Sequence, residues 1–175
     1  MDKNGYLYVS NRKKHEVTRW KIGDKTGTIV AGGNGEGNNL NQFNQPNYIF
    51  VDENHSLYVV DWGNQRVMKW KKDAKNGIIV AGGNGDGGSL KQLCFSEGIV
   101  VNQYSQIFVA DYLNHRVMSW LEGHEEASIA VGGNEAGDQS NQLNGPSGLS
   151  FDSRGNLYVV DKENQRIQKF ELMLH

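Results

Sequence analysis

The chain is built from one sequence unit that returns every fifty residues without insertion or deletion. The clearest copies are LYVVDWGNQRVMKW from Leu57, IFVADYLNHRVMSW from Ile107 and LYVVDKENQRIQKF from Leu157. A degraded copy, LYVSNRKKHEVTRW, starts at Leu7. A fixed period of roughly 20 to 50 residues is typical of solenoids, propellers and other arrays. One unit should therefore explain the whole fold.

Each unit is expected to form four antiparallel strands. In the second copy these are residues 48–52, 57–61, 66–71 and 78–83, short runs rich in Val, Ile and aromatic residues between clusters of Asn, Gly, Asp and Ser. Both alternating sets of side chains in 57–61 are apolar, so both faces of that strand should be covered. A four-stranded sheet packed on both faces and repeated along a chain is a β-propeller blade.

The expected fold is therefore all-β, a single array of propeller blades over residues 1–175. The copies fall at about 1–47, 48–97, 98–147 and 148–175, and they supply three, four, four and three strands. About 3.5 repeats form either an incomplete propeller or a small one.

The repeated Asp-x-x-Asn-x-Arg hairpin, with Asn114-His115-Arg116 in the third copy and the segment NGPSGLSFDSRGNLYVVD before the last one, resembles the NHL repeat. Kelch repeats have a similar period and paired glycines but match this hairpin less well. The resemblance implies a propeller of six blades, which needs about 300 residues at this period. We therefore expect an open arc that self-associates or belongs to a longer propeller, because its end sheets would expose pairs such as Leu7/Val9 and Leu157/Val159 or their opposite-side neighbours.

An aspartate ends one strand and an arginine begins the next in three copies, so each pair should close its hairpin by charge-assisted hydrogen bonds. These structural pairs are Asp61 and Arg66, Asp111 and Arg116, and Asp161 and Arg166. The first copy has Asn11 and Glu16 in their place, as expected of a terminal repeat.

Successive strands of a blade reverse direction, so the hairpins and the long Gly-Asn loops between blades should emerge at one end of the array. Exposed residues that vary within a fixed frame can determine the choice of partner. The candidate binding residues on this face are Trp62, Asn64, Tyr112, Asn114, His115, Lys162 and Asn164.

The favoured function is a binding or scaffold module without catalysis, with a protein as partner. Many proteins with NHL repeats, the TRIM-NHL type among them, are ubiquitin ligases, so the module could recruit a substrate for a catalytic part outside this sequence. The resemblance also implies two alternatives. One is RNA binding, favoured by lysines and arginines near Trp20 and Trp70, and the other is a metal-dependent lyase.

No cofactor or metal is expected. The GxGxxG motif at 83–88 precedes a strand, whereas a dinucleotide site needs a helix there. We interpret it as a flexible loop between blades. His15 and His115 lie two copies apart, on different blades, and Cys94 is the only cysteine.

No apolar run is long enough to span a membrane. The absence of a leader segment and of a possible disulfide favours the cytoplasm, while an extracellular location stays open if the chain is a piece of a longer one. The net charge of −2 is asymmetric, because residues 1–75 carry an excess of four positive charges and the remainder an excess of six negative ones.

Overall fold

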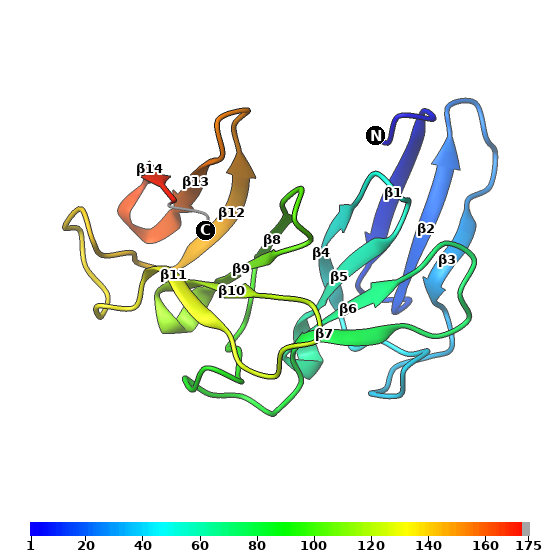
Figure 1. Ribbon diagram of the computed structural model, residues 1–175. Coiled ribbons are helices and arrows are strands. Elements are labelled where there is room, and N and C mark those ends of the chain that lie inside the picture. Colours follow the sequence, from blue (N-terminus) through cyan, green and yellow to red (C-terminus); the bar gives the residue numbers. More distant parts are fainter. Residues whose placement is uncertain (173–175) are drawn as a thin grey trace.

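The computed structural model describes residues 1–172 and contains four antiparallel β-sheets arranged in an open arc (Figure 1). Sheet 1 consists of β1 (Tyr6–Asn11), β2 (Glu16–Lys21) and β3 (Thr28–Gly32). Sheet 2 consists of β4 (Pro46–Val51), β5 (Leu57–Asp61), β6 (Arg66–Trp70) and β7 (Ile78–Gly82). Sheet 3 consists of β8 (Gly98–Val101), β9 (Ile107–Asp111), β10 (Arg116–Trp120) and β11 (Ser128–Gly132). Sheet 4 consists of β12 (Pro146–Phe151), β13 (Asn156–Asp161) and β14 (Arg166–Glu171).

Within each sheet the strands follow one another in chain order, as in propeller blades. The predicted all-β fold of three-stranded and four-stranded blades is confirmed. The first and last sheets lie at opposite ends of the arc and do not meet, so the chain forms an incomplete propeller (Figure 1).

The core lies between the sheets, because each sheet has two apolar faces. In β5, Leu57 and Val59 pack with Val17 toward sheet 1, while Tyr58 and Val60 pack toward sheet 3. All five residues of β5 are buried. This double coverage is what the continuous apolar pattern predicted.

The linkers between sheets enter the next blade in one repeated way. Gln45, Phe95 and Gly145 have positive φ, and the next residue is a proline in the first and last linkers and Ser96 in the middle one. The Ser96 hydroxyl oxygen is buried and has no hydrogen-bond partner among the described residues. The middle linker therefore adopts the conformation of the other two without their proline.

Candidate functional site

The hairpins between the second and third strands of each blade are tight turns of one geometry. In sheet 2, residues Trp62–Asn64 form a single 3-10 turn, and Gln65 follows in the left-handed region with φ of 49°. The carbonyl of Gln65 accepts a hydrogen bond from Gly83 N at 2.9 Å, so the turn is also fastened to the loop after β7. His115 and Gln165 occupy the same left-handed position in their hairpins.

The buried aspartate at the start of each hairpin organises its polar contacts. The Asp111 carboxylate is fully buried and accepts bonds from Cys94 N at 2.7 Å, Asn114 Nδ2 at 2.8 Å and Arg116 Nε at 2.8 Å. Burial raises the pKa of Asp111 above the ordinary carboxyl value, although these three donors act to lower it. Asp61 has the equivalent bonds, and burial raises its pKa in the same way.

The arginine of each pair also holds the loop that leads into its own blade. Arg116 donates from Nη1 to Gly88 O at 2.8 Å and from Nη2 to Ser89 O at 3.0 Å. Asn114 adds a bond to Gly87 O at 2.9 Å. Each hairpin and its Gly-Asn loop therefore form one hydrogen-bonded unit, so both lie on the same face of the arc.

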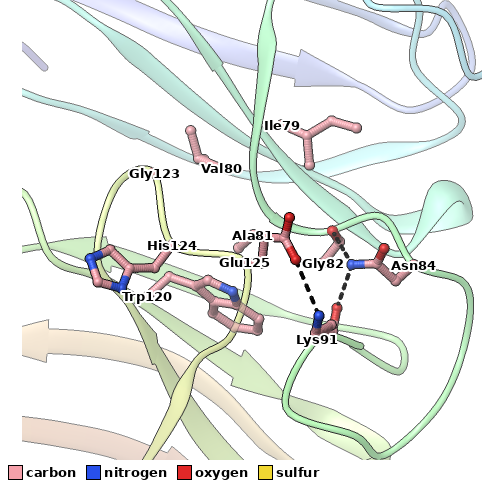
Figure 2. Close-up of a pocket in the computed structure, with 10 residues that line it drawn as sticks. All are labelled: Ile79, Val80, Ala81, Gly82, Asn84, Lys91, Trp120, Gly123, His124 and Glu125. Atoms are coloured by element: carbon pink, nitrogen blue, oxygen red, sulfur yellow. Dashed lines mark hydrogen bonds and ion pairs between the residues drawn. The ribbon is translucent and has the colours of Figure 1, made fainter.

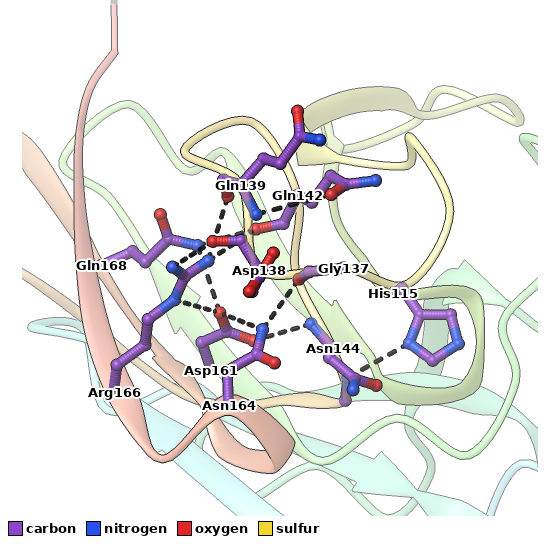
Figure 3. Close-up of polar contacts among 11 residues, drawn as sticks. His115, Gly137, Asp138, Gln139, Gln142, Asn144, Asp161, Asn164, Arg166 and Gln168 are labelled. Carbon is purple, nitrogen blue, oxygen red and sulfur yellow. Dashed lines mark hydrogen bonds and ion pairs between the residues drawn. The ribbon is translucent and has the colours of Figure 1, made fainter.

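Sheet 4 has the same network (Figure 3), although its arginine is more exposed than that of sheet 3. Arg166 Nε donates to Asp161 at 2.7 Å, and its other nitrogens donate to carbonyl oxygens of the loop before β12. Burial acts to raise the pKa of Asp161, but Asn144 N, Asn164, Arg166 and Gln168 all donate to this carboxylate and together hold its pKa below the ordinary value.

The Gly-Asn loops, which the sequence analysis interpreted as flexible connections, contain hydrogen bonds of their own. Gln42 Nε2 donates to Asn34 O at 2.9 Å, and Asn34 Nδ2 donates to Asn41 O at 2.9 Å. Gln92 and Gln142 repeat the first bond in the other loops. A fully buried side chain then anchors each loop in the core, namely Phe43, Leu93 and Leu143.

The hairpins and the three Gly-Asn loops together form one face of the arc, which we call the hairpin face. Its hairpins are residues 12–15, 62–65, 112–115 and 162–165. Here the structure brings the candidate residues into contact with neighbouring blades. Trp62 packs edge-on against Phe95 at 4.7 Å between ring centres, and the Arg12 guanidinium lies 5.0 Å from the Trp62 ring centre.

The next pair of hairpins is joined by polar contacts. Tyr112 Oη donates to Glu163 at 2.6 Å, and Lys162 Nζ lies 5.0 Å from the Tyr112 ring centre. Lys162 also forms an ion pair with Glu97 at 3.3 Å. Leu113, at the tip of this hairpin, is 48% exposed.

Sequence reasoning missed the role of the left-handed hairpin residue. His15 Nδ1 accepts a bond from Gln45 N at 3.2 Å, and His115 Nδ1 accepts one from Gly145 N at 3.2 Å. In the second copy, Gln65 Oε1 serves the same purpose. The signal was the alternation of His and Gln at one repeat position, because both side chains can accept a hydrogen bond at that reach. The hairpin asparagines also use their side-chain amides within the molecule, because each donates to a glycine carbonyl of its loop. These residues are Asn64, Asn114 and Asn164.

The Asp or Asn residue that follows the first strand of sheets 2, 3 and 4 closes a turn. Asp52 Oδ1 accepts bonds from Asn54 N and Ser56 N, and Asp152 accepts the equivalent bonds in sheet 4. Asn102 does the same in sheet 3. This is the ordinary function of Asx residues in turns.

A pocket of about 360 Å³ lies between the outer edge of sheet 2 and the β10–β11 turn (Figure 2). Its polar groups bind one another, since Lys91 Nζ pairs with Glu125 at 3.2 Å and Asn84 Nδ2 donates to Lys91 O at 3.0 Å. Cys94 does not line this pocket, and burial raises the pKa of its thiol to about 12, so it stays protonated at neutral pH and is a poor nucleophile.

Within residues 1–172, no three His, Cys, Asp or Glu side chains gather in a way that could hold a metal ion. That part of the chain also has no helix of the length and apolar character needed to cross a membrane.

The basic residues of the first two copies divide between two ends of the blades. The hairpin at 12–15 carries Arg12, Lys13 and Lys14. The other group, Lys71, Lys72 and Lys75, lies in the turn at 71–77, which follows β6 at the opposite end of the blade. Lys69 is buried and forms an ion pair with Glu122 at 2.8 Å.

Comparison with known proteins supports the sequence resemblance and the fold. A family model described as "NHL repeat" matches residues 143–170, so the predicted NHL resemblance is confirmed in the fourth copy. No curated protein matches the sequence significantly.

Among solved structures, an auxiliary nutrient binding protein from Bacteroides thetaiotaomicron is 19% identical with a TM-score of 0.72, over 95% of this chain and 45% of its own. A chain of the nidogen/laminin complex is 17% identical with a TM-score of 0.69, over 97% of this chain and 56% of its own. A streptogramin B lyase is 11% identical with a TM-score of 0.60, over 98% of this chain and 53% of its own. The chain thus spans about half the length of these proteins, and identities this low establish the fold alone.

Proposed function

We propose that this chain, which carries an NHL repeat on an open arc of β-propeller blades, is a non-catalytic module that binds protein through its hairpin face. The observation that carries the proposal is the combination of a fixed frame with variable tips. Three hairpins share the same Asp, Asn and Arg contacts to a loop, while their centres are Gly63, Leu113 and Glu163. Such a frame holds different side chains in place at low entropic cost.

The candidate residues have two functions in this proposal. Asn64, Asn114, Asn164 and His115 hold the frame through their internal bonds. The other candidate residues contact neighbouring blades, and these are Trp62, Tyr112 and Lys162. The two aromatic side chains are partly exposed, and aromatic residues held in this way suit contacts with protein.

The apolar tip favours protein over nucleic acid as the partner. Leu113 is an exposed apolar side chain beside Tyr112 in the hairpin, and the Tyr112 ring contacts Lys162 of the Glu97–Lys162 ion pair. Glu97 and Glu163 lie here with Lys162 as the one cation among these contacts, which does not favour phosphate, whereas an apolar tip with a polar rim is typical of the centre of a protein interface. Recruitment of a ubiquitin ligase substrate is one role that such a face would allow.

The test selects peptides from a random displayed library on the wild-type chain and measures their affinity for two variants by fluorescence polarisation. Leu113→Glu alters the hairpin face, and Tyr104→Glu alters a residue that is 66% exposed in the turn at the opposite end of the same sheet. We expect Leu113→Glu to weaken binding at least ten-fold and Tyr104→Glu to leave it unchanged. Equal affinities for all three chains would refute the proposal.

An RNA arm separates the alternative. Binding of single-stranded RNA is measured on the same chains at increasing salt, where phosphate contacts predict a steep loss of affinity. We expect only weak association. A tight, sequence-selective complex at physiological salt would replace protein with RNA as the partner class.

A further inference from the structure

Sheet 1 exposes a face that the inner sheets bury. Leu7 is 44% exposed, while Leu57, at the same place in the repeat, is 3% exposed. Val9 is exposed and Val59 is fully buried. Trp20, the repeat equivalent of two buried tryptophans, is only half-buried. We call Leu7, Val9 and Trp20 the first open face.

Sheet 4 has the opposite face exposed. Ile167 is 68% exposed, while Val67 at the same repeat position is fully buried. Val160 is exposed and Tyr158 is half-buried. We call Tyr158, Val160 and Ile167 the last open face. The backward face of sheet 4 is covered, since Leu157 and Val159 pack against sheet 3.

Faces equivalent to these two pack against each other wherever two sheets of the chain meet. Between sheets 2 and 3, the equivalents of the last open face (from sheet 2) and of the first open face (from sheet 3) share one core cluster. Its members include Tyr58, Val60 and Val67 from sheet 2 and Ile107, Val109 and Trp120 from sheet 3. Sheets 1 and 2 and sheets 3 and 4 meet through equivalent positions. No junction of the described residues joins two faces of the same kind.

We propose that the last open face of one molecule packs on the first open face of a second copy, head to tail. The ends of the chain carry opposite net charge, which favours this orientation over the joining of two like ends. Residues 1–45 contain seven Lys or Arg and four Asp or Glu, whereas residues 133–172 contain four and six. Opposite charges attract the unlike ends, and like charges oppose an isologous contact.

The proposal concerns the ends of the arc and does not depend on the function of the hairpin face. A head-to-tail contact leaves one face of each kind free after each addition, so it continues until the assembly closes into a ring. The wild-type chain should therefore form species at multiples of 19.5 kDa.

The test uses two variants that each remove one face. Val9→Glu blocks the first open face and leaves the last one intact, and Ile167→Glu does the reverse. Light scattering after size exclusion should give a 19.5 kDa monomer for each variant alone. Their equimolar mixture should form a complex of two chains, because each supplies the face that the other lacks. The control Tyr104→Glu should assemble as the wild type does.

Three results would overturn the proposal. A wild-type chain that stays monomeric at high concentration would show that the faces do not associate. If only one variant lost self-association, like faces would be pairing. If the mixture stayed monomeric, the faces would not be complementary. Thermal melting shows whether the variants fold, and Val9→Thr with Ile167→Thr repeats the mixing experiment with smaller changes if either glutamate variant unfolds.

Discussion

Removal of Arg116 should destabilise the chain far more than removal of Arg166, although both make the same contacts. The Arg116 side chain is 6% exposed and the Arg166 side chain is 32% exposed. In Arg116→Met the buried Asp111 carboxylate loses its cation, and three partly buried hydrogen bonds to carbonyls of the preceding loop are lost. Breaking a buried ion pair by removing one partner costs about 3–5 kcal/mol.

In Arg166→Met, water can replace the lost donors to the loop before β12, and Gln168 still donates to Asp161. We expect a loss of about 1–2 kcal/mol in this case, because the groups left unpaired are partly solvated. For a chain of this size 1 kcal/mol corresponds to roughly 2–4 °C in Tm, so Arg116→Met should lower Tm by roughly 10 °C.

Urea denaturation and thermal melting of both variants measure the difference. Lys169→Met is the control, since it removes an exposed ion pair with Glu171 and should change stability by less than about 0.5 kcal/mol. Equal losses for Arg116→Met and Arg166→Met would refute the reasoning that burial sets the cost.

Three other substitutions test the fold and its electrostatics. Ser96→Pro should raise the free energy of unfolding by about 1 kcal/mol, because it removes a buried unpaired hydroxyl and restricts the unfolded chain; a lower Tm would contradict this. Gly98→Ala should cost about 3 kcal/mol or more in urea denaturation, because the added Cβ would collide with the backbone carbonyl of Ser147 in the next sheet. The pKa of Asp161 is lowered in the folded state, so its contribution to stability is present above the unfolded value of about 3.9 and is lost as pH falls through the folded pKa. Asp161→Asn should therefore be less stable at pH 7 and show a smaller further loss below about pH 4 in denaturation curves; an unchanged acid limb would count against it.

The gapless period was enough to predict the blades because strand, turn and strand recur in register. The β5 segment, with four apolar residues before Asp61, could only be a strand covered on both faces, and the structure buries all five residues. The exposed end faces were also predicted from the repeat, and no sheet among the described residues covers Leu7 and Val9. The first hairpin was expected to be atypical, and there Asn11 closes the turn through bonds from Lys13 N and Lys14 N.

Much of the candidate site depended on contacts that no local pattern encodes. Arg66 was expected to bind Asp61, but its bonds to Asn38 O and Asn39 O join groups more than half a repeat apart in sequence. The contacts of Trp62 could not be predicted either, because Arg12 comes from the first copy and Phe95 from the linker that leads to sheet 3.

The sequence by itself determined the strands, the turns and the two-faced apolar pattern, because these depend on residue type and on spacing along a few residues. Only the tertiary structure decided which polar groups pair. A hydrogen bond needs two groups within about 3 Å, and the packing of neighbouring sheets, in which Leu57 and Val17 share one core cluster, brings groups from different parts of the chain together. The Gly-Asn loops are likewise held in the hairpin face by tertiary contacts, namely the arginine bonds to their carbonyls and the buried side chains of Phe43, Leu93 and Leu143.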